Sequence, residues 1–298
     1  MTLRPAAPLA VAVVLAAASS LWLARPAHAS SRFSGVSIDD SRADEGCGGL
    51  RVRFGNEPAL LEESAFTLPA GQPARISVED GGGLRVRGGR GTSFEVTACR
   101  FGADAEALSG VSVGVDGSSV TARARGRGES TVFLLVTMPK GATLDLSAGN
   151  GPVSVRDAEG SVSLKAANGP VSIRDLHGTL DATLANGPVT IRGGSGSYRV
   201  RAANGPLSVS LAGKSWDGGV LDASTVNGPL TLAVDPGFAS PVRVESGSWT
   251  PVSCRAAACD GARRTGDDET RTIEIGSGEP VVRLSATNGP VTVRDASR

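Results

Sequence analysis

Hydrophobic and polar positions alternate along much of the chain, in short runs that follow a recurring Asn-Gly-Pro tripeptide. Val153–Arg156 and Val171–Arg174 carry a β-branched residue at every second position, with Ser or Arg between them. This period of two is typical of a half-buried strand. A second alternating run follows each of them, after a turn that contains Gly160 or Gly178. The pattern therefore predicts an all-β protein.

The tripeptide recurs in register, and its first four copies are 18 residues apart. A fixed short period is the signature of a stacked repeat architecture, so we predict a β-solenoid, similar to a single-chain parallel β-helix, with two strands and two turns per coil. Antiparallel hairpins are the alternative, because Asn-Gly also suits hairpin loops. We favour the solenoid, since each period contains two different turns. The copies begin at Asn150, Asn168, Asn186, Asn204, Asn227 and Asn288.

The turn residues suggest a ladder of side chains. Asn and Gly accept backbone angles that suit a tight turn, and the Pro that follows can occupy the first position of a strand. Neighbouring coils would lie about 4.8 Å apart, so identical turns would bring the asparagine amides within hydrogen-bonding reach. We predict a structural turn ladder made of Asn150, Asn168, Asn186 and Asn204.

The chain divides into three parts. Residues 1–29 read as a signal peptide, with Arg4, an apolar stretch and Ala27-His28-Ala29 as the cleavage site. A retained membrane anchor is the alternative, but the apolar stretch is short for a span, and no later segment is apolar enough to cross a bilayer. We expect residues 30–73 to cap residues 74–298, the β-solenoid repeat domain. The register is lost at about 246–273, where we expect an insertion.

The cysteines indicate an oxidising compartment. The chain contains Cys47, Cys99, Cys254 and Cys259, an even number that favours disulfides in an exported protein but allows three connectivities. We favour Cys254–Cys259, which closes a local loop within the insertion, and Cys47–Cys99, which ties the N-terminal segment to the repeats. A zinc site is the alternative, but it needs closer cysteine pairs or added histidines.

The net charge of the chain is close to zero. Without residues 1–29, which include Arg4 and Arg25, the chain has 28 basic and 30 acidic residues. This balance does not attract nucleic acid or an anionic membrane through bulk charge. The 40 glycines and the 4% of aromatic residues suit a chain that turns often, and they are unusual for a compact enzyme.

Candidate catalytic and metal-binding groups are few, and we predict no catalytic, cofactor or metal site. His177 lies beside a turn glycine, with no nucleophile motif near it. Asp157 and Asp175 are one repeat apart, and a separation of about 4.8 Å would resemble a retaining glycosidase pair. Each follows an arginine, however, which suggests a solvated turn. A calcium β-roll motif begins at Gly193 but has Tyr198 where Asp is required.

Aromatic residues provide the candidate contact surface. Trp216 lies in the widened repeat and Trp249 at the edge of the expected insertion, so both interrupt the regular coil. Exposed aromatic side chains are common in ligand sites. We consider both tryptophans as possible contacts, with the alternative that they cover the edge of the solenoid or a local gap.

Segments 138–147, 275–278 and 282–289, together with Asn150-Gly151, resemble the bacterial DUF4097 family, whose members are labelled "putative adhesins". The likeness covers residues 74–298 and implies an exported β-repeat protein without a catalytic or ligand-binding motif. The Cys47 segment and the Cys254–Cys259 insertion depart from the family pattern.

We therefore expect a non-catalytic, adhesin-like structural or interaction surface in the cell envelope, in the periplasm or at the cell surface. Its partner would be an envelope or surface protein or a glycan. A polysaccharide-binding or polysaccharide-degrading β-helix protein is the alternative.

Overall fold

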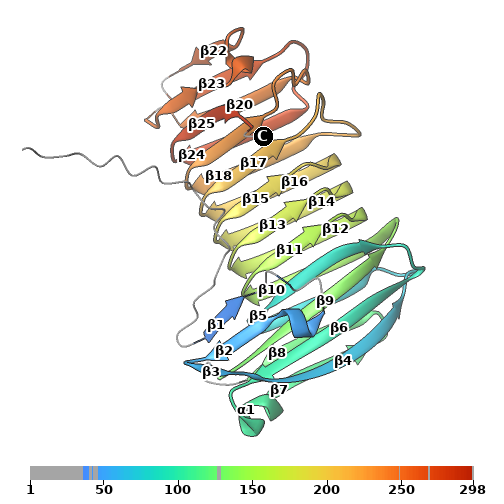
Figure 1. Ribbon diagram of the computed structural model, residues 1–298. Coiled ribbons are helices and arrows are strands. Elements are labelled where there is room, and N and C mark those ends of the chain that lie inside the picture. Colours follow the sequence, from blue (N-terminus) through green and yellow to red (C-terminus); the bar gives the residue numbers. More distant parts are fainter. Residues whose placement is uncertain are drawn as a thin grey trace, which may run out of the picture.

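The computed structural model describes residues 36–39, 42, 46–125, 129–247, 249–267 and 269–296. Almost all of its elements are strands, so the all-β prediction is confirmed (Figure 1). Helical structure within these ranges is confined to α1 (Ala105–Ser109) and to the 3₁₀ turns η2 (Cys47–Gly49) and η3 (Ala257–Cys259). The predicted signal peptide, residues 1–29, lies outside the described residues.

The repeats form two stacks of parallel strands. In each stack, a strand pairs with the equivalent strand of the next repeat, so that Asn150 lies opposite Asn168 and Val153 opposite Val171. We call one strand from each stack at the same level a rung. The long-strand stack contains β10 (Ala142–Asn150), β12 (Glu159–Asn168), β14 (His177–Asn186), β16 (Ser195–Asn204), β18 (Leu221–Asn227) and β24 (Val282–Asn288). The short-strand stack contains β11 (Val153–Arg156), β13 (Val171–Arg174), β15 (Val189–Arg192), β17 (Leu207–Leu211), β19 (Leu230–Val234) and β25 (Val291–Asp295).

The core lies between the two stacks. Successive side chains of a strand point to opposite faces, so every second residue of each strand enters this core. Leu144, Val162 and Leu180 form one buried column of the long-strand stack. Val155 and Ile173 belong to a buried column of the short-strand stack. Because apolar side chains occupy the equivalent buried positions of successive rungs, the apolar core is continuous along the stack.

The regular repeats turn at two corners, one within a rung and one that leads to the next rung, and both use positive φ. At the Asn-Gly-Pro corner the glycine takes positive φ, 143° at Gly151, whereas the asparagine does not. At the second corner Asp157 and Asp175 have φ of 48° and 46°, and Gly193 occupies the same place in the next repeat at 61°. Asp tolerates this region better than most residues, which explains the Asp after the repeated Arg.

At the N-terminal end, the order of the rungs in space differs from their order in the sequence. The long strand β5 (Ala74–Gly89) contributes to both stacks, and it pairs with β10 and β11 on one side. On its other side it pairs with β8 (Ser119–Ala124) and β9 (Ser130–Pro139). Antiparallel strands then close the two stacks. They are β4 (Leu60–Pro69), β6 (Ser93–Gly102) and β7 (Val111–Asp116).

The C-terminal end repeats this arrangement. Strand β24 lies between β18 and β20 (Val242–Gly247), and β25 lies between β19 and β21 (Val252–Cys254). The rung that is last in the sequence, formed by β24 and β25, thus lies in space between the rung of β18 and β19 and the rung of β20 and β21. Antiparallel strands β23 (Thr270–Ile275) and β22 (Arg263–Gly266) complete this end (Figure 1).

A small cap covers the N-terminal end of the short-strand stack. It is a three-stranded sheet of β1 (Val36–Asp39), β2 (Arg51–Phe54) and β3 (Glu57–Pro58). Ile38 and Val52 of this sheet and the adjoining Leu50 pack against Phe101 and Phe133 in a second apolar cluster, separate from the main core. The cap therefore covers apolar side chains that would otherwise lie on the outside of the stack.

Candidate binding surface

The outer face of the short-strand stack carries a continuous column of hydroxyl groups. From β11 to β21, one Ser or Thr of each rung lies opposite the Ser or Thr of the next, and all are half-buried; at β5 the equivalent position is Arg85. Their backbones are fixed by the parallel ladder, so the hydroxyls repeat at about 4.8 Å. The column consists of Ser154, Ser172, Thr190, Ser208, Thr231, Thr292 and Ser253.

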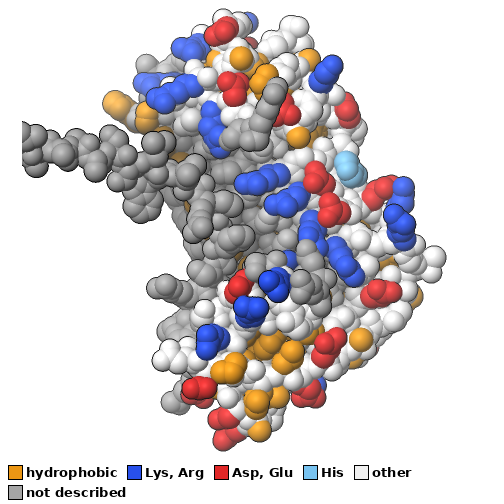
Figure 2. All heavy atoms as spheres, in the orientation of Figure 1, with side chains coloured by type: hydrophobic (Ala, Val, Ile, Leu, Met, Phe, Trp, Pro, Cys, Tyr) orange, Lys and Arg blue, Asp and Glu red, His pale blue; other side chains and the backbone are white. Residues whose placement is uncertain are grey.

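A column of arginines runs beside the hydroxyls, two positions further along each strand. Consecutive rungs contribute Arg87, Arg156, Arg174 and Arg192, and Arg294 continues the column after Ser210 and Ala233. Figure 2 shows Lys and Arg side chains in a band across the middle of the molecule, with acidic side chains beside them. We call the two columns together the Arg–hydroxyl face.

A shallow depression marks the C-terminal part of this face. It has a volume of about 300 Å³ and lies between the two columns, with Thr190, Ser208 and Thr231 on one side and Arg192 and Arg294 on the other. This face was not predicted, although its signal is visible in the sequence. Ser or Thr followed two residues later by Arg recurs in the first three Asn-Gly-Pro repeats and in the last.

The outer face of the long-strand stack has a different charge pattern. From β14 to β24, acidic and basic residues alternate at one position, with Asp181 opposite Arg199, Arg199 opposite Asp222, and Asp222 opposite Arg283. A depression of about 530 Å³ is lined by these residues and by hydroxyl groups. Opposite charges on neighbouring strands stabilise each other, so this face neutralises much of its own charge.

The structure places the asparagines of the predicted turn ladder in one column. Asn168 donates from Nδ2 to Asn150 Oδ1 at 2.8 Å, and Asn186 donates to Asn168 at 2.9 Å. The next bonds run from Asn204 to Asn186 at 3.0 Å and from Asn227 to Asn204 at 2.9 Å. The ladder ends at Asn288, which donates to Asn227 at 3.0 Å. It therefore continues through the widened repeat and into the inserted rung.

Trp216 does not belong to a contact surface, which corrects the expectation from the sequence. The side chain is buried, and its indole Nε1 donates to Gly196 O at 2.9 Å. Its ring meets the ring of Tyr198 edge to face, with centroids 5.0 Å apart. The Tyr198 hydroxyl in turn donates to Leu176 O. Gly194 lies against this hydroxyl, where a larger residue would clash, so small residues at this corner admit the aromatic pair.

Trp249 lies on the surface and is 96% exposed. It precedes Thr250 and Pro251 at the corner between β20 and β21, on the outermost C-terminal rung. A fully exposed tryptophan is uncommon, because its large apolar ring favours burial. This residue stays a candidate for contact with a partner, separate from the Arg–hydroxyl face.

The remaining polar candidates lie at the second corner. His177 Nδ1 is 2.8 Å from Ser195 Oγ of the next rung, and both residues are at the surface. Asp157 and Asp175 occupy the positive-φ positions described above, next to Arg156 and Arg174. Across the described ranges, no group of three or more His, Cys, Asp or Glu side chains could hold a metal ion.

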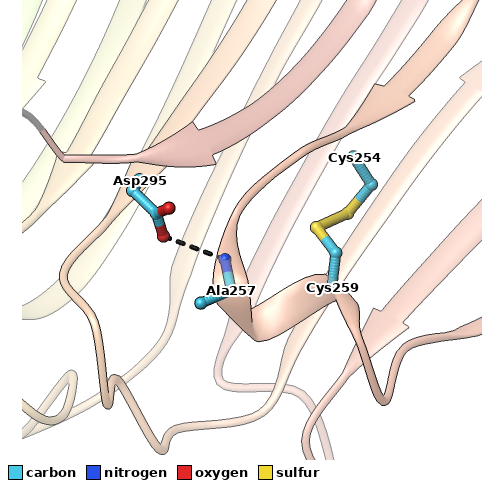
Figure 3. The surroundings of a disulfide bond; sticks show 4 residues. All are labelled: Cys254, Ala257, Cys259 and Asp295. Atoms are coloured by element: carbon cyan, nitrogen blue, oxygen red, sulfur yellow. Dashed lines mark hydrogen bonds between the residues drawn. A yellow bond between two sulfur atoms is a disulfide. The ribbon is translucent and has the colours of Figure 1, made fainter.

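Both disulfides expected from the sequence are present. Cys47 of the cap is bonded to Cys99 of β6, and Cys254 is bonded to Cys259 across the 3₁₀ turn η3. Figure 3 shows that a carboxylate oxygen of Asp295 accepts a hydrogen bond of 3.0 Å from Ala257 N, beside the second disulfide. The hydrogen bond from Ala257 to Asp295 thus attaches the insertion to β25. Strand β21 also pairs with β25 and forms part of a rung.

No family model matches the sequence, and no curated protein matches it. In the part of the chain that the structure describes, no helix is long and apolar enough to cross a membrane. Solved structures with similar coordinates include a "putative cell adhesion protein" from Clostridium sporogenes, with 10% identity and a TM-score of 0.35 over 80% of this chain and all of that one. A "putative adhesin" from Bacteroides fragilis has 9% identity and a TM-score of 0.31, over 79% and 97% of the two chains. A "putative lipid binding protein" from Parabacteroides distasonis has 10% identity and a TM-score of 0.29, over 80% and 97%.

Proposed function

We propose that this protein is an exported β-solenoid that serves, without catalysis, as an adhesin-like interaction surface in the cell envelope. The observation that carries the proposal is the Arg–hydroxyl face, which presents the same two side-chain types to solvent on successive rungs. Such a face offers repeated, identical contacts to a repetitive partner, and many weak contacts on one rigid body combine into strong binding.

The solenoid itself supports this role. The two stacks share one core, and their strands are hydrogen-bonded from rung to rung, so the outer face is rigid. A preorganised surface binds without the entropy loss of ordering loops. The exposed Trp249 adds a second contact at the far end.

The cysteines support an extracytoplasmic location. Disulfides persist in oxidising compartments and are rare in the cytosol of most organisms. Both pairs here lie at the ends of the stack, where they attach the cap and the insertion. The protein therefore suits the periplasm or the cell surface.

Localisation and thiol state test the proposal together. An epitope-tagged copy should be recovered with the envelope or outside the cell, and its cysteines should resist alkylation until a reductant is added. Protease digestion on intact cells would place the protein at the surface, and protection until permeabilisation would place it in the periplasm. Recovery in the cytoplasm with reactive thiols would contradict the proposal.

A further inference from the structure

We propose that the Arg–hydroxyl face binds a linear acidic polysaccharide built from uronic acid units, lying along the stack across the rungs. The inference rests on the proposed function and names the partner class. The arginines would hold the carboxylates, and the adjacent column of Ser and Thr would exchange hydrogen bonds with the sugar hydroxyls.

The arginines of the column repel one another. Like charges directly opposite on neighbouring strands are destabilising, and Arg87, Arg156, Arg174 and Arg192 occupy four consecutive rungs. Asp157 and Asp175 at the adjacent corner offset part of this repulsion. An anionic chain laid along the column would convert it into attraction.

The contrast with the other stack strengthens the argument. In the long-strand stack, from the rung of Arg192 onward, Asp181, Arg199 and Asp222 alternate and neutralise one another. The solenoid can therefore accommodate alternating charge, yet the arginine column carries the same charge on four consecutive rungs. Arg also suits carboxylates through paired N–H···O bonds in one plane.

The geometry favours a polymer over a small anion. The hydroxyls repeat at the inter-strand distance of about 4.8 Å from β11 to β21, and the arginines repeat at this distance over four consecutive rungs. A chain with an anion on each unit can therefore contact several rungs at once. Such a chain would lie in the depression that separates Arg192 and Arg294 from the hydroxyls of Thr190, Ser208 and Thr231.

The side chains present favour a sugar polymer over a nucleic acid or polyphosphate. Single-stranded nucleic acids are held by aromatic side chains on which bases stack, whereas the two columns consist of Ser, Thr, Arg and one Ala. The gap at Ser210 and Ala233 and the nearby aspartates lower the positive charge density. A moderate density suits one carboxylate per sugar better than a chain of phosphates.

Polygalacturonate and alginate are the probes for the test, with dextran as the neutral control and single-stranded DNA and polyphosphate as anionic controls. The mature protein, with both disulfides intact, is titrated with each polymer by calorimetry at several salt concentrations. We expect both uronates to bind and dextran not to bind. Added salt should weaken the uronate binding, because salt screens exposed charges.

Matched variants assign the binding to one face. R174Q combined with R192Q should weaken polygalacturonate binding by about tenfold or more, since each Arg–carboxylate contact is charge-assisted. R199Q combined with R201Q removes the same charge from exposed positions of β16 on the other stack and should have little effect. T190V combined with S208A should weaken binding without changing its salt dependence. Circular dichroism establishes that each variant is folded.

The outcomes separate the two proposals. Equal losses in the two arginine pairs, no uronate binding, or equal or tighter binding of DNA or polyphosphate would overturn the inference. An envelope protein that fails to bind uronates would refute only the partner class. A cytoplasmic protein would refute the proposed function, whatever it binds. Shortening of the polymer during incubation would contradict the non-catalytic role.

Discussion

At the residue scale, the Asn-Gly-Pro corner depends on the absence of a side chain at its glycine. Gly187 has φ of 126°, and a Cβ there would lie 2.2 Å from the carbonyl oxygen of Gly169 in the previous rung. The left-handed backbone and the close approach of two rungs therefore exclude other residues. Repetition of this contact makes the corner a structural requirement at every level.

Replacement of Gly187 by Ala should destabilise the protein strongly. We expect the free energy of unfolding to fall by about 3 kcal/mol or more, because the change adds both backbone strain and overlap with the neighbouring carbonyl. Gly114→Ala is the control, since a Cβ added there would meet no atom within 4 Å and its φ is not left-handed. Urea denaturation measures both variants, and equal stability would refute this account of the corner.

The single tyrosine gives a pH prediction. Burial raises the pKa of the Tyr198 phenol well above its ordinary value of about 10, and the charge of Asp175 adds to the effect. The folded protein therefore holds this proton more tightly than the unfolded chain does. The stability from this group is complete below about pH 10 and is lost as the pH rises toward the folded-state pKa.

Ultraviolet absorbance of the phenolate reports this ionisation, because Tyr198 is the only tyrosine in the chain. We expect no phenolate signal near pH 10 while circular dichroism shows a folded protein, and a signal that appears together with unfolding. Ionisation of the folded protein at the ordinary pKa would contradict the burial of this hydroxyl.

At the scale of elements, the two disulfides differ in the length of chain that they close. Cys47–Cys99 spans 52 residues, and Cys254–Cys259 spans 5. The entropy of loop closure predicts a stabilisation of about 4 kcal/mol for the long loop and about 2 kcal/mol for the short one. The cap should therefore depend more on its disulfide than the insertion does.

The paired variants C47A/C99A and C254A/C259A test this difference by thermal unfolding in oxidising buffer. We expect the larger loss of stability for the first pair, accompanied by binding of a hydrophobic dye as Phe101 and Phe133 lose their cover. A larger loss in the second pair would show that the insertion, not the cap, limits stability.

The sequence predicted the middle elements well, because the partner of each strand there lies one repeat away. Alternation identified the buried residues of the regular strands, and the tripeptide identified their corners. Trp216 was harder to place, because it lies outside any alternating run and is buried through its contacts with Tyr198 and the Gly196 carbonyl of the long-strand stack. The arginine column was overlooked because each arginine was read with its neighbouring aspartate, not with the arginine one rung away.

At the scale of the whole molecule, the order of the rungs could not be read from the sequence. The copy at Asn288 carries the same motif as the others, so the motif shows that it stacks but not between which neighbours. Its position between β18 and β20 is decided by tertiary pairing. The same holds for β5, which lies inside β8 and β9.

A chain that ends after Val281 should lose more than the rung it lacks. This truncation removes β24 and β25, which connect β20 and β21 to the rest of the stack. We expect limited proteolysis to digest the segment beyond Val234, while the rungs from β10 to β19 stay protected. A chain that ends after Ala296 is the control and should resist digestion. Protection of β20 to β23 in the shorter chain would contradict this dependence.

The inserted rungs also restrict how such a protein can change in size over evolution. A repeat appended after β25 could not pair with β25, because β19 and β21 already pair with its two edges. A duplicated 18-residue unit within β10 to β17 would meet identical corners above and below and would extend the asparagine ladder by one bond. Relatives of different length should therefore differ in the number of central repeats, while the ends stay constant.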